Sequence, residues 1–183
     1  MTAAEYCFID TNVLLTASDK DRPNHTAAVH FLESGLRGEK RLFTNGQVFR
    51  EYLVVATRSV ENNGFGLSPN DALSNLHTFS TSIQLLNESQ AVAQKLHKLA
   101  ADYQLKGKRI HDANIVATMQ ENGLTHLKTY NQSDFTAFDF IQFAWAKWSF
   151  HSKIIIQARV LHFATPSGSA ESNAVLALDI RAS

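Results

Sequence analysis

The chain has 183 residues, of which 44% are hydrophobic and 19% charged, a composition that can bury one sizeable core. Its 17 basic and 17 acidic side chains give a net charge of zero, which argues against a protein that coats nucleic acid without specificity. Neither a leading apolar segment with a basic flank nor an apolar run that could span a bilayer occurs, so we expect a cytoplasmic protein with no membrane contact. The single cysteine, Cys7, excludes an internal disulfide.

The first predicted element is a short strand that ends on a carboxylate. Residues 6–9 are all apolar, which is typical of a strand buried on both faces, although a buried helical segment fits the same pattern. Asp10, Thr11 and Asn12 follow directly. Ligands of open α/β sheets bind outside the carboxyl ends of the strands, so Asp10 is a candidate site residue. The alternative is that Asp10 only caps the next helix.

Predicted helices and strands then alternate as far as about residue 141. Ser68 and Gly123 mark a helix start and a helix end, and Asn45-Gly46 predicts a turn. The expected helices cover residues 25–36, 47–58, 69–80, 90–103 and 110–121, and the expected later strands cover residues 41–44, 82–86 and 124–130. Strands that alternate with helices of this length imply βαβ crossovers. The sequence therefore predicts an α/β fold with a mainly parallel sheet covered by helices.

Two further carboxylates, Glu51 and Asp112, lie on the apolar faces of their predicted helices. The neighbours of Glu51 three and four positions away are Val48, Val54 and Val55, and Asp112 repeats the pattern. A buried carboxylate without a partner is costly, so each needs a basic side chain or a metal ion. The helix dipole contributes only about 0.3–1 kcal/mol, which is too little to explain burial. This comparison favours a metal ion.

A fourth carboxylate, Asp134, follows the strand predicted at residues 124–130. Like Asp10 it would lie at the carboxyl edge of the sheet. A simple turn acid fits the sequence equally well, and Asn131 could share or replace its role. Four acids in one pocket would leave a modest basic excess on the remaining surface, which suits a polyanion delivered to metal ions.

Three basic residues, Lys106, Lys108 and Arg109, directly precede His111 and Asp112. They could hold the phosphates that flank the reacting one in a single strand. The same residues are equally consistent with a solvated charged loop that does not bind phosphate.

Four short motifs together resemble the PIN domain family, and within it the VapC-type toxins of bacterial toxin–antitoxin pairs. The motifs are Phe-Ile-Asp-Thr-Asn at 8–12, Gln-Val-Phe-Arg-Glu-Tyr at 47–52, His-Asp-Ala-Asn-Ile at 111–115 and Thr-Tyr-Asn with Asp-Phe at 129–135. The resemblance covers residues 5–141. It implies a three-layer α/β/α sandwich and a Mg²⁺- or Mn²⁺-dependent ribonuclease. The acidic active-site residues that the resemblance implies for this ribonuclease are Asp10, Glu51, Asp112 and Asp134.

The resemblance has further implications. Thr11 and Asn12 match the polar residues that orient the first carboxylate. A small antitoxin protein is the implied partner and RNA the implied substrate, and we also expect a homodimer.

Hydrolysis by a metal-activated water is also the chemistry that the residues favour without the resemblance. Mg²⁺ takes oxygen ligands, and the sequence shows no zinc-ligand spacing, no Walker loop and no nucleophile elbow. Two alternatives stay open. A haloacid-dehalogenase-like phosphatase also begins with an Asp after a buried strand, but its second acid is replaced here by Asn12. A catalytically inactive PIN-like RNA-binding module would keep the fold and lose the metal.

Residues 142–183 do not match the short ending expected of the family. We expect a PIN-like nuclease domain at residues 1–141, followed by a C-terminal extension at residues 142–183 whose structure the sequence does not define. Aromatic side chains crowd residues 143–150, and residues 154–156 suggest a strand. An added hairpin, an oligomer contact and a region that displaces the usual ending are all compatible with this pattern.

Overall fold

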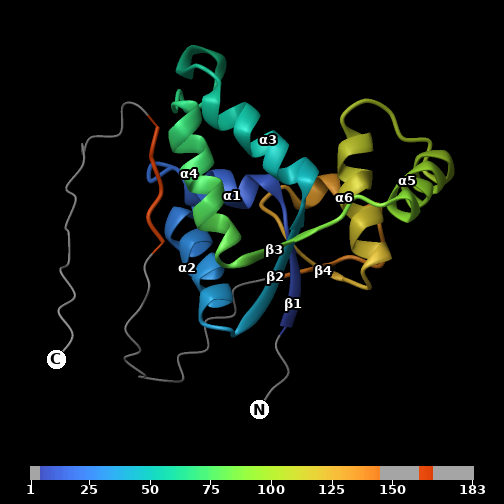
Figure 1. The fold of residues 1–183 in the computed structure, drawn as a ribbon. Helices are drawn as coiled ribbons and strands as arrows, with labels where there is room; N and C mark the ends of the chain where they lie inside the picture. The colour runs from blue at the N-terminus through green and yellow to red at the C-terminus, as the bar shows by residue number, and fades with distance from the viewer. Residues whose placement is uncertain (1–4, 145–160, 167–183) are drawn as a thin grey trace.

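The computed structural model describes residues 5–144 and 161–166. A five-stranded sheet in the order β3-β2-β1-β4-β5 lies at its centre, and every neighbouring pair is parallel (Figure 1). The strands are β1 (Glu5–Ile9), β2 (Lys40–Asn45), β3 (Ile83–Leu86), β4 (His126–Lys128) and β5 (Gln142–Phe143). The six α-helices of the described chain are α1 (Thr11–Ala17), α2 (His25–Leu36), α3 (Gly46–Thr57), α4 (Pro69–Ser80), α5 (Gln90–Asp102) and α6 (Arg109–Glu121).

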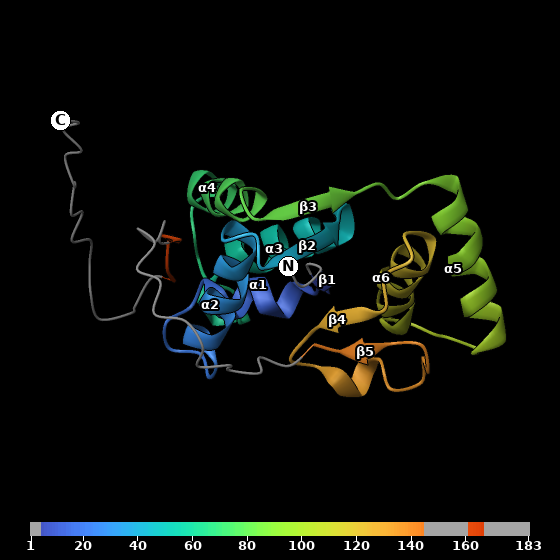
Figure 2. The ribbon, with the colours of Figure 1, turned by 90° about the horizontal axis from the view of Figure 1, so that it is seen from below.

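The helices cover both faces of the sheet. Figure 2 shows α1 to α4 on one side and α5 and α6 on the other. The predicted three-layer α/β/α sandwich with a parallel sheet is therefore confirmed. Within the described residues no helix is both long enough and apolar enough to cross a membrane.

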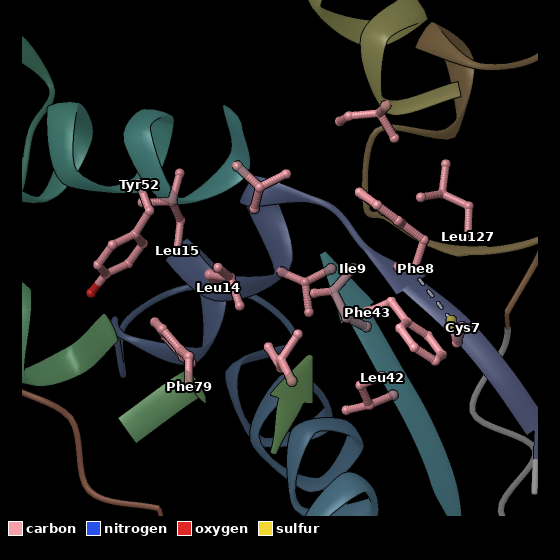
Figure 3. Close-up of a cluster of buried hydrophobic side chains, with 14 of the residues drawn as sticks. Cys7, Phe8, Ile9, Leu14, Leu15, Leu42, Phe43, Tyr52, Phe79 and Leu127 are labelled. Carbon is pink, nitrogen blue, oxygen red and sulfur yellow. Dashed lines mark hydrogen bonds between the residues drawn. The ribbon is translucent and has the colours of Figure 1, made fainter. Parts of the chain in front are cut away.

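The core is built around β1, the middle strand. Cys7, Phe8 and Ile9 are fully buried between β2 and β4, which explains the uninterrupted apolar run. Figure 3 shows how side chains from the sheet and from α1 and α3 fill the space around this strand. The strand stops at Ile9 because Asp10 turns into α1, although the Asp10 N–H still donates to the carbonyl of Lys128 at 3.1 Å.

Some local predictions needed correction. The turn expected at Asn45-Gly46 is wrong: Asn45 ends β2 and caps α3, its Oδ1 accepting from the N–H of Val48 at 3.2 Å. The strand expected at residues 124–130 is shorter, at His126–Lys128. Helix α1 and strand β5 were not predicted as elements. The other helices begin and end within two residues of their predicted bounds.

The chain beyond residue 141 takes part in the fold. Gln142 and Phe143 form the edge strand β5 beside β4, so the sheet continues two residues past the expected domain boundary. Residues 161–166, drawn in orange-red in Figure 1, lie beside α4. The strand expected at residues 154–156 lies outside the described residues.

Candidate metal-dependent active site

A cleft of about 750 Å³ opens where β1, β2 and β4 end. It is lined by the elements that follow these strands, together with the first turn of α6. The structure brings all four predicted carboxylates to this cleft: Asp10, Glu51, Asp112 and Asp134. It also brings the predicted supporting residues there: Thr11, Asn12 and Asn131.

Asp10 is both a helix cap and part of the cleft wall. Its Oδ1 accepts a hydrogen bond from the backbone N–H of Thr11 at 2.6 Å at the start of α1. Its Oδ2 accepts from Asn12 Nδ2 and from Thr129 Oγ1, both at 2.7 Å. Three donors therefore fix the carboxylate in one orientation. The capping role that the sequence offered as an alternative is present together with the position in the cleft.

Glu51 is held by residues of three helices. Its Oε2 accepts from Thr11 Oγ1 at 2.7 Å, and its Oε1 accepts from Gln47 Nε2 at 2.7 Å. His111 Nδ1 lies 3.7 Å from the same Oε1. Gln47 also donates to the carbonyl of His111 and accepts from Asn114 Nδ2 at 2.8 Å. The Gln47 amide thus joins α3 to α6 and places Glu51 beside the first turn of α6.

Asp112 has a buried oxygen, Oδ2, with no hydrogen-bond partner. The pKa of Asp112 is raised to about 6, mainly by burial and, to a smaller extent, by the negative charges of Asp134 and Glu51. Burial also raises the pKa of Asp10 to about 6, with smaller contributions from Glu51 and Asp112. Both shifts have the same origin, since burial and neighbouring negative charge each disfavour the ionised form. A cation in the cleft would instead favour the ionised carboxylates and so lower both pKa values.

Asp134 lies in the short 3₁₀ helix η2 (Gln132–Asp134), and its side chain is 30% exposed. Its Oδ2 lies 4.0 Å from Lys108 Nζ. Of the three basic residues predicted to bind phosphate, Lys108 lines the cleft, whereas Lys106 and Arg109 are not among its lining residues. The basic loop therefore contributes one of its three side chains to the cleft wall.

Two arginines add to the cleft wall: Arg50 on α3, and Arg58, the residue that directly follows α3. They flank Val54, an exposed apolar residue one helical turn from each. Arg50 Nη2 pairs with Glu88 Oε2 at 3.0 Å. Arg58 has no ion pair within the described part of the chain. The rim of the acidic cleft thus carries positive charge on α3, at the residue after α3 and at Lys108.

Two residues that organise the cleft were not predicted as site residues. Gln47 precedes Glu51 by one helical turn, so the spacing of four residues could have pointed to it. Thr129 binds Asp10 across 119 positions of sequence, and only the pairing of β1 with β4 brings them together.

The cleft suits a hard cation bound through few protein ligands. In the described residues no three His, Cys, Asp or Glu side chains stand close enough together to form a ready metal cage. Mg²⁺ does not need one, since it keeps several waters and is commonly held by one or two carboxylates and the substrate phosphate. The donors here are carboxylate oxygens, and Asp112 Oδ2 is a buried one without a partner. These residues fit Mg²⁺ or Mn²⁺.

The parallel sheet, the helices on both faces and the acidic cleft at the carboxyl ends of the strands define the class of this protein. The chain belongs to the PIN domain family, whose model matches residues 7–141. The four motifs singled out in the sequence lie inside this range. Family membership rules out the haloacid-dehalogenase-like alternative.

Known proteins share this fold and sequence pattern. Ribonuclease VapC24 of Mycobacterium tuberculosis is 33% identical over 139 residues, which cover 72% of this chain and 90% of that protein. The structure of VapBC2 from Rickettsia felis, bound to a promoter DNA fragment, has a TM-score of 0.58 at 14% identity and covers 76% of this chain and 98% of that one. A toxin–antitoxin complex from Klebsiella pneumoniae has a TM-score of 0.50 at 22% identity, with 74% and 95% covered. These two structures show a shared fold.

Proposed function

We propose that the chain is a Mg²⁺- or Mn²⁺-dependent endoribonuclease. The observation that carries this proposal is the convergence of Asp10, Glu51, Asp112 and Asp134 on one cleft, with a buried Asp112 oxygen that has no partner. The similarity to Ribonuclease VapC24 supports RNA as the substrate. The exposed cations at the rim, Lys108 and Arg58, suit the backbone of a nucleic acid.

Each acidic residue has a distinct task in this proposal. Asp112 and Asp10 supply oxygen ligands, because one has a free buried oxygen and the other is fixed by three donors. Glu51, held by Thr11 and Gln47, orients the attacking water. Asp134, whose Oδ2 lies 4.0 Å from Lys108 Nζ, completes the negative wall of the cleft.

A bound Mg²⁺ or Mn²⁺ would supply an acidified water and stabilise the charge that develops on the scissile phosphate. The chain contributes the placement of the charges around it. Because Thr129 and Gln47 lock Asp10 and Glu51 before substrate binds, little reorganisation is needed when RNA enters.

We further propose that the protein is the toxin of a toxin–antitoxin pair and acts in the cytoplasm. Its similarity to VapC24 and the fold it shares with a toxin–antitoxin complex support this proposal. A small antitoxin would place an Arg or Lys among the four carboxylates, and Arg is favoured because its planar fork matches a carboxylate with two hydrogen bonds. The expected homodimer stays a prediction, which sedimentation of the purified chain would test.

The decisive experiment is RNA cleavage by the purified chain with Mn²⁺, with Mg²⁺ and with a chelator. We expect cleavage with either ion, none with the chelator, and none from Asp112→Asn. Asp139→Asn is a matched control, since Asp139 is exposed and does not line the cleft. Binding of RNA without cleavage at saturating Mn²⁺ would favour the inactive RNA-binding module instead.

The toxin assignment has a separate test. The chain is expressed alone and together with the protein encoded by its genomic neighbour. We expect growth arrest in the first case, and co-purification with suppressed RNA cleavage in the second. A neighbour that does not bind, together with normal growth, would end the toxin assignment while leaving the nuclease assignment standing.

A further inference from the structure

A buried asparagine on α4 binds the backbone of a distant segment. Asn75 is 1% exposed, and its Oδ1 accepts from the N–H of Ala164 at 2.7 Å. Its Nδ2 donates to the carbonyl of the same Ala164 at 3.0 Å. One side chain therefore pairs with both backbone groups of one residue, as a neighbouring strand would.

Side chains on both sides of this contact support it. The rings of Phe79, on α4, and Phe163 pack with centroids 4.7 Å apart. Leu161 is buried, whereas His162 between them is exposed. The segment thus alternates inward and outward like an extended peptide lying on a surface.

The remaining hydrogen bonds of Asn75 tie this contact to the helices of the acidic cleft. Asn75 Nδ2 also donates to Tyr52 Oη at 2.8 Å, and Tyr52 Oη lies 2.9 Å from Ser18 Oγ. Tyr52 follows Glu51 on α3, and Ser18 ends the helix that Asp10 begins. Figure 3 shows Tyr52 and Phe79 close together on this side of the core.

Without residues 161–166 this arrangement would be costly. Asn75 would keep its bond to Tyr52 but lose the protein partners of Oδ1 and of one Nδ2 hydrogen, which water or another peptide would have to replace. Phe79 would lose an aromatic neighbour. The PIN family match ends at residue 141. The segment that supplies the hydrogen-bond partners of Asn75 therefore lies outside the matched part of the chain.

We propose that Asn75 and Phe79 on α4, together with Tyr52 on α3, form a peptide-docking site that is occupied in the same copy by the chain's own residues 161–166. The ligand is an extended peptide with four positions in a fixed order. An apolar residue comes first, as at Leu161, followed by a residue that faces solvent, as at His162. An aromatic residue and then a small residue come next, and the backbone of the small residue binds Asn75. We treat docking as a separable binding event, because residues 145–160 lie between β5 and the segment in the sequence and the site holds Phe163 and Ala164 by direct contacts. The proposal does not rest on nuclease activity.

The test uses the full chain and a labelled peptide, Leu-His-Phe-Ala-Thr-Pro. In the Phe163→Ala variant the internal segment is weakened, so the free peptide should bind, with at least tenfold higher affinity than to the wild type, whose site is filled. His162→Ala is the matched control, and this variant should exclude the peptide as the wild type does. A Phe163→Ala, Asn75→Ala double variant should lose peptide binding. Failure of the peptide to bind Phe163→Ala, or equal binding to the double variant, would overturn the proposal.

Two further measurements keep the proposal testable if Phe163→Ala does not fold. In the wild type, the amide of Ala164 should exchange its hydrogen at least tenfold more slowly than the amide of His162, and fast exchange at Ala164 would contradict docking. The wild type should show the same docking at all protein concentrations. Protection of Ala164 that appears only as dimers form would assign the occupant to a second copy and overturn docking within one chain.

Discussion

Thr11 Oγ1 donates a hydrogen bond of 2.7 Å to Glu51 Oε2 and so joins the first turn of α1 to α3 across the acidic cleft. Thr11 is 7% exposed, so water does not readily replace this donor. The bond lets the residue after Asp10 set the direction of the second carboxylate. The position of Glu51 therefore depends on a hydroxyl that itself need not touch RNA or metal.

Thr11→Val should separate this role from stability. The substitution keeps the shape and removes the donor, leaving Glu51 with Gln47 as its main partner. We expect kcat/KM for RNA cleavage to fall about tenfold, the equivalent of ~1.4 kcal/mol. The free energy of unfolding should fall by only about 1 kcal/mol, the usual contribution of one hydrogen bond. Thr57→Val, at the exposed end of α3, is the matched control and should retain full activity. Unchanged cleavage by Thr11→Val would show that Glu51 needs no help from Thr11.

Asp112→Asn should abolish cleavage and stabilise the metal-free protein. The buried Oδ2 has no partner, and Asp134 and Glu51 add like charge, so neutralising residue 112 relieves repulsion. Thermal unfolding in a chelator should shift upward by a few degrees, since about 1 kcal/mol corresponds to ~2–4 °C for a chain of this length. With saturating Mn²⁺ the wild type should gain more stability than the variant. A lower melting temperature for Asp112→Asn in chelator would contradict this account.

The stability of the metal-free protein should fall between about pH 4 and pH 6. Both Asp10 and Asp112 have a pKa of about 6 in the folded chain, raised from 3.8, so within this window the folded state binds more protons than the unfolded state. Stability then decreases as pH rises through that window. The measurement is chemical unfolding in chelator across the range for wild type and Asp112→Asn. The advantage of the variant should grow with pH and level off above about 7, and an advantage independent of pH would refute the raised pKa of Asp112.

Lys108→Ala should weaken RNA binding in a salt-dependent way. Lys108 lines the cleft and lies 4.0 Å from Asp134, whereas Lys106 is not part of the lining. Losing one phosphate contact should reduce the slope of log affinity against log salt by about 0.7 for a single strand. Lys106→Ala is the matched control, with an unchanged slope. Equal slopes for the two variants would mean that the basic loop is a solvated surface.

The sequence predicted the sheet edge well because its signals are local. The apolar run before Asp10 and the apolar stripes around Glu51 and Asp112 each lie within one element, and all three acids reach the cleft. Helix α1 was missed because it is only seven residues long, which is too short to show a clear helical period. Strand β5 has two residues and is defined by its pairing with β4, which no local pattern reveals.

The contacts within the cleft were harder to predict. Which cation of the basic loop reaches the acids depends on where α6 begins, and Lys108, the residue before its first turn, is the one that does. Thr129 reaches Asp10 only because two strands pair across the sequence. The docking of Ala164 on Asn75 joins residues 89 positions apart and has no sequence signature.

The double role of Asp10 bears on how an inert form of this protein should be made. Both oxygens of Asp10 accept hydrogen bonds, so an amide at this position would face another donor, either the N–H of Thr11 or the pair from Asn12 and Thr129. The Asp10→Asn variant would therefore have a disturbed start of α1. Loss of RNA cleavage by this variant could come from that disturbance or from the loss of a metal ligand. Asp112 Oδ2, in contrast, accepts no hydrogen bond that an amide would disturb. Crystallisation with intact RNA, and overproduction without harm to the host, are better attempted with Asp112→Asn.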